Sequence, residues 1–312
     1  MTSQQPSKLK IISAFIAVYF VWGTTYLAIK YAIETIPPFM MMGMRSLIAG
    51  VVLYTWGRLR GDGNATRKEL PSLILIGSLF FLIGHGALAW AQQTVPSGVA
   101  ALLVASEPII IALFEPLFTM EGRVQKRTVI GMFIGICGIA VLVVPQGLDF
   151  GKANLLGSFG ILIGASSWAS GAIYSRVAKL PRSPLITGGL QLLFGGVLLI
   201  LMSFILGEWS DFRFSQVQVR SWLGLAYLIL FGSIITFSAY TWLLTVISAT
   251  RISTHTFINP VVAVLVGWAF AGEKLTKEML IAAILIIIAV YLVLFRKKAA
   301  ANPNETQEQN MI

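Results

Sequence analysis

Residues 39–51, FMMMGMRSLIAGV, align without gaps on residues 185–197, LITGGLQLLFGGV. Among the residues that the two segments share at a separation of 146 positions, Gly43, Gly50 and Val51 match Gly189, Gly196 and Val197. The repeat extends in both directions, at separations of 146 and 152 positions, through the pairs Trp22/Trp168, Trp90/Trp242, Pro108/Pro260 and Glu121/Glu273. These matches indicate that one half of the chain is a copy of the other.

The composition indicates whether this duplicated fold lies in water or in a membrane. Of the 312 residues, 56% are hydrophobic and only 12% are charged, whereas soluble domains average roughly 45–50% and 25%. One bilayer crossing needs about 20 apolar residues, so the chain is long enough for ten helices with short loops. We therefore predict an all-α integral membrane protein with ten transmembrane helices, at residues 11–30, 38–57, 71–93, 96–119, 128–145, 154–175, 184–206, 221–246, 251–272 and 278–295.

Ten crossings divide into two halves of five. We expect a first repeat at residues 11–145, a linker at 146–153 outside the membrane and a second repeat at 154–296. Polar segments flank them at 1–10 and 297–312, and the second of these is expected to be disordered. Because five is odd, the second half should lie upside down relative to the first. Inverted repeats related by an axis in the membrane plane are typical of secondary transporters, whose halves exchange two conformations.

The net charge of +10 is explained by topology rather than by nucleic-acid binding. If the N-terminus is cytoplasmic, 16 lysines and arginines lie in cytoplasmic segments and 6 in external ones, with Arg45 inside a helix. Positive residues accumulate in cytoplasmic loops. We therefore expect a multi-pass protein of the bacterial inner membrane with both termini in the cytoplasm. Its expected partners are the lipid bilayer and a small-molecule substrate, and the sequence predicts no particular oligomeric state.

Three ionisable residues inside the predicted helices are candidates for substrate binding or ion coupling: Arg45, His85 and Glu107. A charge inside a bilayer is costly and needs a partner, a wet cavity or a function. In the second half the matching residues are Gln191, Phe237 and Asn259, so the scaffold does not require these three. Two further groups, Glu115 and His255, are expected near the membrane surface.

Arg45 and Glu107 fall at similar depths, which leaves two hypotheses open. They bind the carboxylate and the ammonium group of an amino acid, with Glu107 also able to exchange a proton. Alternatively, they form a permanent ion pair that locks two helices together. For His85, which lies between Gly84 and Gly86, the choice is between a ligand contact and a backbone carbonyl partner.

Two prolines are expected to break or kink their helices near the membrane midplane. Proline lacks a backbone donor, and the carbonyl that it frees is tolerated only against protein or a wet cavity. Glu107-Pro108 and Asn259-Pro260 are therefore matched candidates for a cavity wall. A static packing kink is the alternative.

Several aromatic residues lie away from the interfacial belts where such side chains gather. They either line a cavity and close over a ligand or fill the core. The candidates for cavity lining, together with Asn259, are Trp22, Tyr26, Trp90, Trp168, Tyr174 and Trp242.

Missing motifs narrow the function. The chain has no G-x-x-x-x-G-K-[ST] loop, no H-E-x-x-H helix and no G-x-S-x-G elbow, so we expect no ATP hydrolysis, cofactor, metal or enzymatic activity. A membrane-embedded enzyme would need clustered carboxylates. A channel would need a continuous pore, which bulky aromatic residues at mid-depth disfavour. A secondary exporter working by alternating access fits best, with the enzyme and the channel as alternatives.

The repeat and its motifs resemble a known family. Two five-helix halves with Trp22-Gly23, Pro108, Pro260 and the Glu121/Glu273 pair are similar to the drug/metabolite transporter superfamily, and more closely to its EamA-type exporters. The segment at 22–50, WGTTYLAIKYAIETIPPFMMMGMRSLIAG, is similar to the YedA-like branch. The resemblance covers residues 11–296. It implies a central cavity lined by the first four helices of each half, the fifth and tenth helices packed outside, and efflux of amino acids or related metabolites.

Overall fold

The computed structural model describes residues 7–95, 97–108, 110–111, 114, 126–143, 152–210, 212–271 and 277–294, and within these ranges it contains helices and no strands. The helices of the first half are α1 (Lys8–Ile16), η1 (Ala17–Val21), α2 (Trp22–Ala32), α3 (Pro38–Leu59), α4 (Leu70–Gly77), η2 (Ser78–His85), α5 (Gly86–Ala91), α6 (Ser97–Val104) and α8 (Lys126–Val143). The helices of the second half are α9 (Lys152–Val177), α10 (Pro184–Ile205), η4 (Phe214–Gln216), α11 (Val219–Tyr227), η5 (Leu228–Ile235), α12 (Thr236–Val246), α13 (Ala249–Ile252), α14 (His255–Ala271) and α15 (Lys277–Leu294).

Seven helices are long and apolar enough to cross a membrane. They are Lys8–Ala32, Pro38–Leu59, Leu70–Ala91, Leu155–Val177, Pro184–Ile205, Val219–Val246 and Ala249–Phe270. The other three expected crossings contain α6, α8 and α15, which are not among the seven. The prediction of an all-helical membrane protein is therefore confirmed, and the number ten stays a prediction. Glu115, Glu121, Glu273, most of the linker and the segment 297–312 lie outside the described residues.

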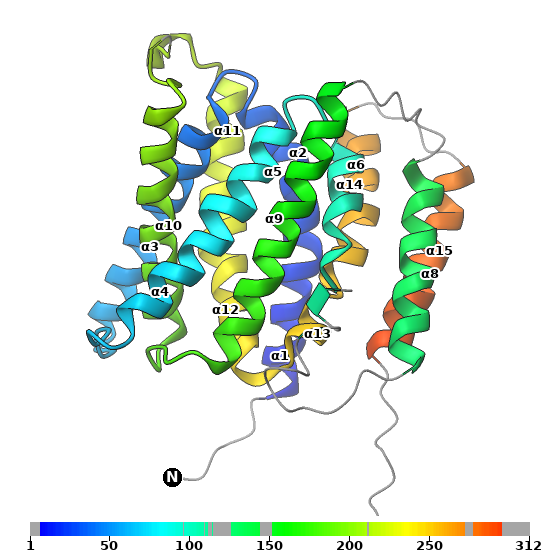
Figure 1. The fold of residues 1–312 in the computed structure, drawn as a ribbon, viewed down its shortest axis with the longest axis horizontal. Coiled ribbons are helices and arrows are strands. Elements are labelled where there is room, and N and C mark those ends of the chain that lie inside the picture. Colours follow the sequence, from blue (N-terminus) through cyan, green and yellow to red (C-terminus); the bar gives the residue numbers. More distant parts are fainter. Residues whose placement is uncertain are drawn as a thin grey trace, which may run out of the picture.

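The duplicated segments that open the sequence pack against each other. They belong to α3 and α10, which run antiparallel side by side (Figure 1). A Cβ atom added to Gly43 would lie 2.6 Å from Ile200 Cδ1, and one added to Gly189 would lie 2.7 Å from the backbone nitrogen of Tyr54. Gly50 faces Leu193 and Gly196 faces Leu47 in the same way. Glycine is needed here because the two helix backbones approach so closely.

Other contacts between the halves are also related by exchanging one half for the other. α2 packs against α11 and α14, while the matching α9 packs against η2, α5 and α6. α8 and α15 pack mainly on each other and stand beside the main bundle (Figure 1). The contacts of α2 with α11 and η5 are matched by those of α9 with α4 and η2, which are the pairs obtained when the halves are swapped.

The helix ends and loops that carry most of the described lysines and arginines lie at one end of the bundle, the lower end in Figure 1, which we call the basic end. The described residues at the basic end are Lys8, Lys10, Arg58, Arg60, Arg67, Lys68, Lys126, Arg127, Arg176, Lys179, Arg182 and Arg251. The opposite end carries fewer, among them Lys30, Arg213 and Arg220.

Three π-helical segments interrupt the crossings: η1, η2 and η5. π-turns inside α-helices are rare and are often found at functional sites. η1 ends directly before Trp22 and η2 ends at His85, so two of the three lead into residues predicted for the site.

Candidate functional site

A buried cavity lies between α2, α3, η2, α5, α6, α9 and α14. Its empty space, including adjoining open solvent, is about 620 Å³. The lining residues are Trp22, Thr25, Tyr26, Ile29, Arg45, Gly84, His85, Leu88, Val104, Glu107, Ile161, Gly164, Ala165, Trp168, His255 and Asn259. The apolar members Ile29, Leu88 and Ile161 lie toward the opposite end of their helices, so the cavity extends away from the basic end.

The cavity brings together most of the residues predicted from the sequence. Arg45, His85 and Glu107 all line it, as do Trp22, Tyr26, Trp168 and Asn259. The first three come from α3, η2 and the stretch after α6, so three different helices supply the ionisable groups.

Three predicted lining residues lie elsewhere. Trp90 packs against Gly160, with Cζ3 3.0 Å from the position of a Cβ atom there. The Tyr174 hydroxyl is 3.1 Å from Ser72 Oγ, and the Trp242 ring lies 4.5 Å from Lys10 Nζ. These side chains belong to helix–helix contacts and do not line the cavity.

Arg45 is held by one strong hydrogen bond. Its side chain is 2% exposed, and Nε donates to Ser233 Oγ at 2.7 Å. The other contact is Nη1 with Met42 Sδ at 3.7 Å, and sulfur is a weak acceptor. The guanidinium therefore keeps most of its donors for a ligand.

Glu107 lies at the point where its helix breaks. α6 ends at Val104 and the chain turns at Ala105 and Ser106, directly before Glu107-Pro108. Glu107 is 2% exposed, and its Oε1 has no hydrogen-bond partner among the residues that the structure describes. No ion pair joins it to Arg45, although both line the same cavity and both are described. This conformation does not contain the lock that the sequence left open.

His85 presents an imidazole without a partner on Nδ1 in the described part of the chain. Its ring stacks on Trp168, with 5.0 Å between the centroids and 29° between the planes. The neighbouring glycines admit other helices rather than a ligand. A Cβ atom on Gly86 would lie 2.8 Å from Phe39, and one on Gly84 would lie 3.3 Å from Trp168.

His255 was expected near the membrane surface, and this was wrong. It is 3% exposed in the cavity wall, 4.9 Å from Trp22 between ring centroids, and its Nδ1 is 2.9 Å from the Ile252 carbonyl oxygen. The helix is interrupted at Ser253 and Thr254, so α14 begins at His255. This break, which turns His255 inward, was not recognised in the sequence.

Pro260 does not break its helix, since α14 continues through it. The preceding Asn259 joins two crossings instead. With its amide nitrogen facing the two acceptors, it donates to the carbonyl oxygens of His255 at 3.0 Å and Tyr19 at 2.8 Å. The helix is thus interrupted just before Pro108 and continuous through Pro260, and a kink at Pro260 stays a prediction.

An aromatic layer closes the cavity toward the basic end. It consists of Trp22, Phe80, Trp168, Phe237 and Tyr240, which are in mutual ring contact. Trp168 Nε1 donates to the Tyr240 hydroxyl at 3.0 Å, which joins α9 to α12. Phe80, Phe237 and Tyr240 were not singled out in the sequence, because apolar aromatic residues in a membrane helix resemble ordinary core.

Beyond the aromatic layer lies a second pocket at the basic end. Its volume, including adjoining solvent, is about 890 Å³, and it is formed by the second half alone. Along α9 the order is cavity, Trp168, then the pocket residues Ser175 and Arg176. Gln191, which matches Arg45, lines this pocket, and its Oε1 has no partner among the described residues.

Polar contacts fasten the basic end. Arg176 Nη1 donates to the carbonyl oxygens of Leu244 at 3.0 Å and Ile247 at 2.7 Å. The Tyr19 hydroxyl is 2.7 Å from Thr254 Oγ1, which joins η1 to the break before α14. These bonds cross the route between the aromatic layer and the basic end.

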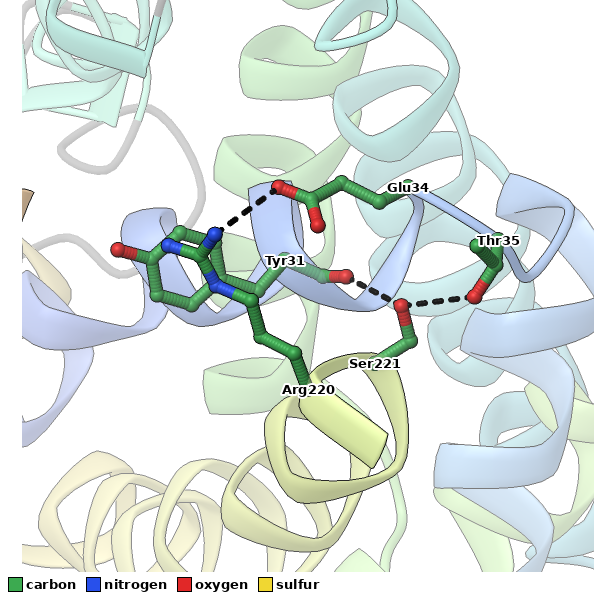
Figure 2. A network of polar contacts seen from close by, with 5 residues as sticks. All are labelled: Tyr31, Glu34, Thr35, Arg220 and Ser221. Atoms are coloured by element: carbon green, nitrogen blue, oxygen red, sulfur yellow. Dashed lines mark hydrogen bonds and ion pairs between the residues drawn. The ribbon is translucent and has the colours of Figure 1, made fainter. Parts of the chain in front are cut away.

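A different network joins α2 to α11 at the opposite end (Figure 2). The Arg220 guanidinium lies 3.5 Å over the Tyr31 ring and 3.9 Å from Glu34 Oε1. Ser221 Oγ donates to the Tyr31 carbonyl oxygen at 2.7 Å and receives the hydroxyl of Thr35 at 2.8 Å. This side of α2 is thus joined to α11 at the end away from the basic end.

The fold and the site define a duplicated multi-pass membrane protein with a buried cavity lined by ionisable residues. The EamA-like transporter family matches residues 9–144 and again residues 155–295, so the chain belongs to this family and is a membrane transporter.

Individual relatives agree with this assignment. The "Uncharacterized inner membrane transporter YedA" of Escherichia coli (strain K12) is 37% identical over 290 residues, covering 93% of this chain and 92% of that protein. The "Uncharacterized transporter YoaV" of Bacillus subtilis (strain 168) is 26% identical, covering 91% and 96%. "Protein PecM" of Dickeya dadantii (strain 3937) is 26% identical, covering 92% and 95%. The expected superfamily and the YedA-like branch are confirmed.

The fold has also been solved in a distant relative. A crystal structure with 20% sequence identity superimposes with a TM-score of 0.75 over 92% of this chain and 98% of the other.

Proposed function

We propose that the chain is a secondary transporter that exports small zwitterionic metabolites of the amino acid class by alternating access. The observation that carries the proposal is that Arg45 and Glu107 line one buried cavity without pairing with each other. An α-carboxylate and an α-ammonium group would supply the missing counterparts. Hydrogen bonds to charged groups contribute roughly 1.5–3 kcal/mol each, so two such contacts would select zwitterions strongly.

The packing of α3 on α10 supports an inverted arrangement of the halves. Gly43 contacts Ile200, and moving each residue by 146 positions into the other half gives Gly189 and Tyr54, which are also in contact. A two-fold axis that exchanges two antiparallel neighbouring helices is perpendicular to both. If α3 and α10 cross the membrane, that axis lies in the membrane plane, as in transporters built from inverted repeats.

The two ends of the bundle differ in a way that supports alternating access. By the repeat, Lys30 matches Arg176, and Gln92 and Val95 match the two residues that accept from it. Lys30 is exposed and makes no hydrogen bond to those carbonyls within the described ranges. The basic end therefore has this fastening of α9 to the end of α12, and the opposite end lacks the matching one between α2 and the residues after α5, although Arg220 and Ser221 join α2 to α11 there. Such a difference is expected when one side of a transporter is closed and the other open.

The distribution of positive charge supports an orientation. With ten crossings and 16 of the lysines and arginines on the N-terminal side, the positive-inside rule assigns the basic end and both termini to the cytoplasm. The cavity then faces outward in this conformation. A relative named as an inner membrane transporter supports the same membrane for this chain.

Counterflow in proteoliposomes tests the proposal. Vesicles containing the purified protein are loaded with one unlabelled L-amino acid and diluted into the same labelled compound, for each of the twenty proteinogenic amino acids. Uptake above that of protein-free vesicles is expected for at least one. Equal flux with and without internal substrate would instead indicate a channel, and chemical conversion of the compound would indicate an enzyme.

A further inference from the structure

The π-helical segment η5 approaches the cavity from behind, through two residues that do not line it. Ser233 accepts the hydrogen bond from Arg45 Nε at 2.7 Å and is itself 1% exposed. The preceding Gly232 accepts with its carbonyl oxygen from Trp22 Nε1 at 3.0 Å. Consecutive residues of one turn thus hold the guanidinium and one indole of the cavity wall.

Gly232 is also needed for its lack of a side chain. A Cβ atom at this position would lie 2.9 Å from Arg45 Nη2 and 3.2 Å from Thr25 Cγ2. The guanidinium is therefore bonded through Nε and bounded by a backbone on its Nη2 side. A planar group held at two points has a fixed orientation, and its remaining N–H groups suit bidentate binding of a carboxylate.

The other half of the chain gives an internal comparison. At the same separation that matches Trp90 with Trp242, Gly232 and Ser233 correspond to Phe80 and Phe81. The residue of the second half that matches Arg45 is Gln191, which carries no charge. The small and hydroxylated pair thus occurs in the half that faces the arginine, and two phenylalanines occur in the half that faces the glutamine.

We propose that Ser233 and Gly232 are positioning residues that determine substrate specificity by fixing the orientation of the Arg45 guanidinium. The inference rests on the proposed function, in which Arg45 binds the substrate carboxylate. A loosened guanidinium still attracts an anion but no longer holds the plane of its N–H groups in the orientation that bidentate binding needs. Loss of Ser233 Oγ should therefore weaken carboxylate ligands and leave ligands without a carboxylate unaffected.

The test compares each L-amino acid that supports counterflow with its C-terminal amide as inhibitors of that counterflow. Ser233→Ala should raise the half-inhibitory concentration of the amino acid about tenfold, the effect of losing one hydrogen bond to a charged group. The half-inhibitory concentration of the amide should stay the same. The ratio of the amino acid's half-inhibitory concentration to that of the amide should therefore rise about tenfold. Ser233→Thr keeps the hydroxyl and should restore the ratio. Ser238→Ala removes a hydroxyl that donates to its own helix at Ile234 and serves as the matched control.

Each result bears on a different statement. A wild-type ratio in Ser233→Ala overturns the positioning role while leaving the proposed function intact. Absence of counterflow with all twenty amino acids in the wild type overturns the proposed function and this inference with it. If Ser233→Ala does not fold, Gly232→Ala replaces it. Its methyl group displaces Nη2, so an unchanged ratio there also overturns the inference.

Discussion

Asp62 and Glu208 occupy equivalent positions in the two halves, and each binds the start of the other half's second crossing. Glu208 accepts hydrogen bonds from the backbone nitrogens of Phe39 at 3.1 Å and Met40 at 2.8 Å, at the beginning of α3. Asp62 accepts from Ser183 Oγ at 2.6 Å, and Ser183 caps α10. Anions at helix N-termini are favourable, so the α3–α10 pair is fastened at both ends.

A glycine with positive φ sets up each of these contacts. Gly61 (φ 82°) and Gly207 (φ 74°) directly precede the two acids. This backbone conformation is adopted routinely only by glycine, and it commonly ends a helix. The chain therefore leaves α3 and α10 in a direction that brings each acid to its partner helix.

Removing the Glu208 carboxylate should destabilise the protein. Loss of an N-terminal cap costs about 1 kcal/mol, so Glu208→Ala should lower the melting temperature in detergent. Glu208→Gln keeps one oxygen acceptor and should lie between Glu208→Ala and the wild type. Glu69→Ala is a suitable control, because that side chain bonds only within its own loop, at Thr66. Equal melting temperatures for all variants would show that the cap contributes nothing.

Changing both cavity charges should separate binding from a structural lock. Because Arg45 and Glu107 are not paired here, Arg45→Gln and Glu107→Asn should each fold and lose affinity for amino acids. One charge-assisted contact corresponds to roughly ten- to a hundredfold in binding. The double variant copies the second half's residues and should bind no better than either single one. Wild-type affinity in the double variant, with unstable single variants, would favour the lock.

Glu107 is also the candidate for proton coupling. Its Oε1 has no partner among the described residues, so the carboxylate is free to exchange a proton or an ammonium ligand. Glu107→Gln should abolish the response of uptake to an imposed pH gradient, while amino acid exchange continues at reduced affinity. The measurement is labelled uptake with and without that gradient. Undiminished pH-driven uptake would remove Glu107 from this role and favour facilitated export down the metabolite's own gradient.

Arg176 should keep the basic end closed. Arg176→Gln removes the two hydrogen bonds to Leu244 and Ile247. Loss of about one hydrogen bond to a charged group shifts the equilibrium between the closed and the open state roughly tenfold. A cysteine at Thr241, which lines the second pocket and is 5% exposed, would report the opening. In a Cys137→Ser background its labelling by an impermeant maleimide should speed up.

Arg182→Gln is the matched control for this labelling experiment. Arg182 lines the same pocket but is exposed and makes none of the bonds to the end of α12. Equal labelling rates in the Arg176 and Arg182 variants would contradict the closing role.

Tags should reveal the orientation of the chain. We expect tags at both termini and between Gly61 and Thr66 to be inaccessible from the periplasm, and a tag within 207–213 to be accessible. The check is labelling of intact cells compared with permeabilised cells. Labelling of either terminus in intact cells would contradict ten crossings, because an even number places both ends on one side.

The repeat predicted which residues correspond in the two halves. It did not predict which face of its helix each residue presents. Trp22 and Trp168 match in sequence and meet edge to face, 5.7 Å apart, at the cavity. Trp90 and Trp242 match equally well and lie in packing contacts. Sequence separation fixes the position along a helix. The face that a residue presents depends on how the helix is rotated, which its neighbours determine.

Hydrogen-bond partners that are far apart in the chain could also not be predicted from the sequence. Depth placed Arg45 and Glu107 near one level, but the partner of Arg45 is Ser233, 188 positions away in the chain. Ser233 lies in a π-helical turn of a largely apolar crossing. Hydrophobic periodicity gives no signal for such a turn. His255 was misplaced for a related reason, since an interruption of two residues changed both its depth and its direction.

The antiparallel contact of α3 with α10 has the symmetry of a homodimer, because one surface serves both partners. A single five-helix chain with this surface would pair with an upside-down twin, and any guanidinium it carried would occur twice. In the joined chain the two copies are free to diverge. Arg45 lies on one side of the axis and the uncharged Gln191 lies on the other. The scaffold is therefore symmetric, but the charge that it encloses is not. A ligand with two different ends can then be held in only one orientation.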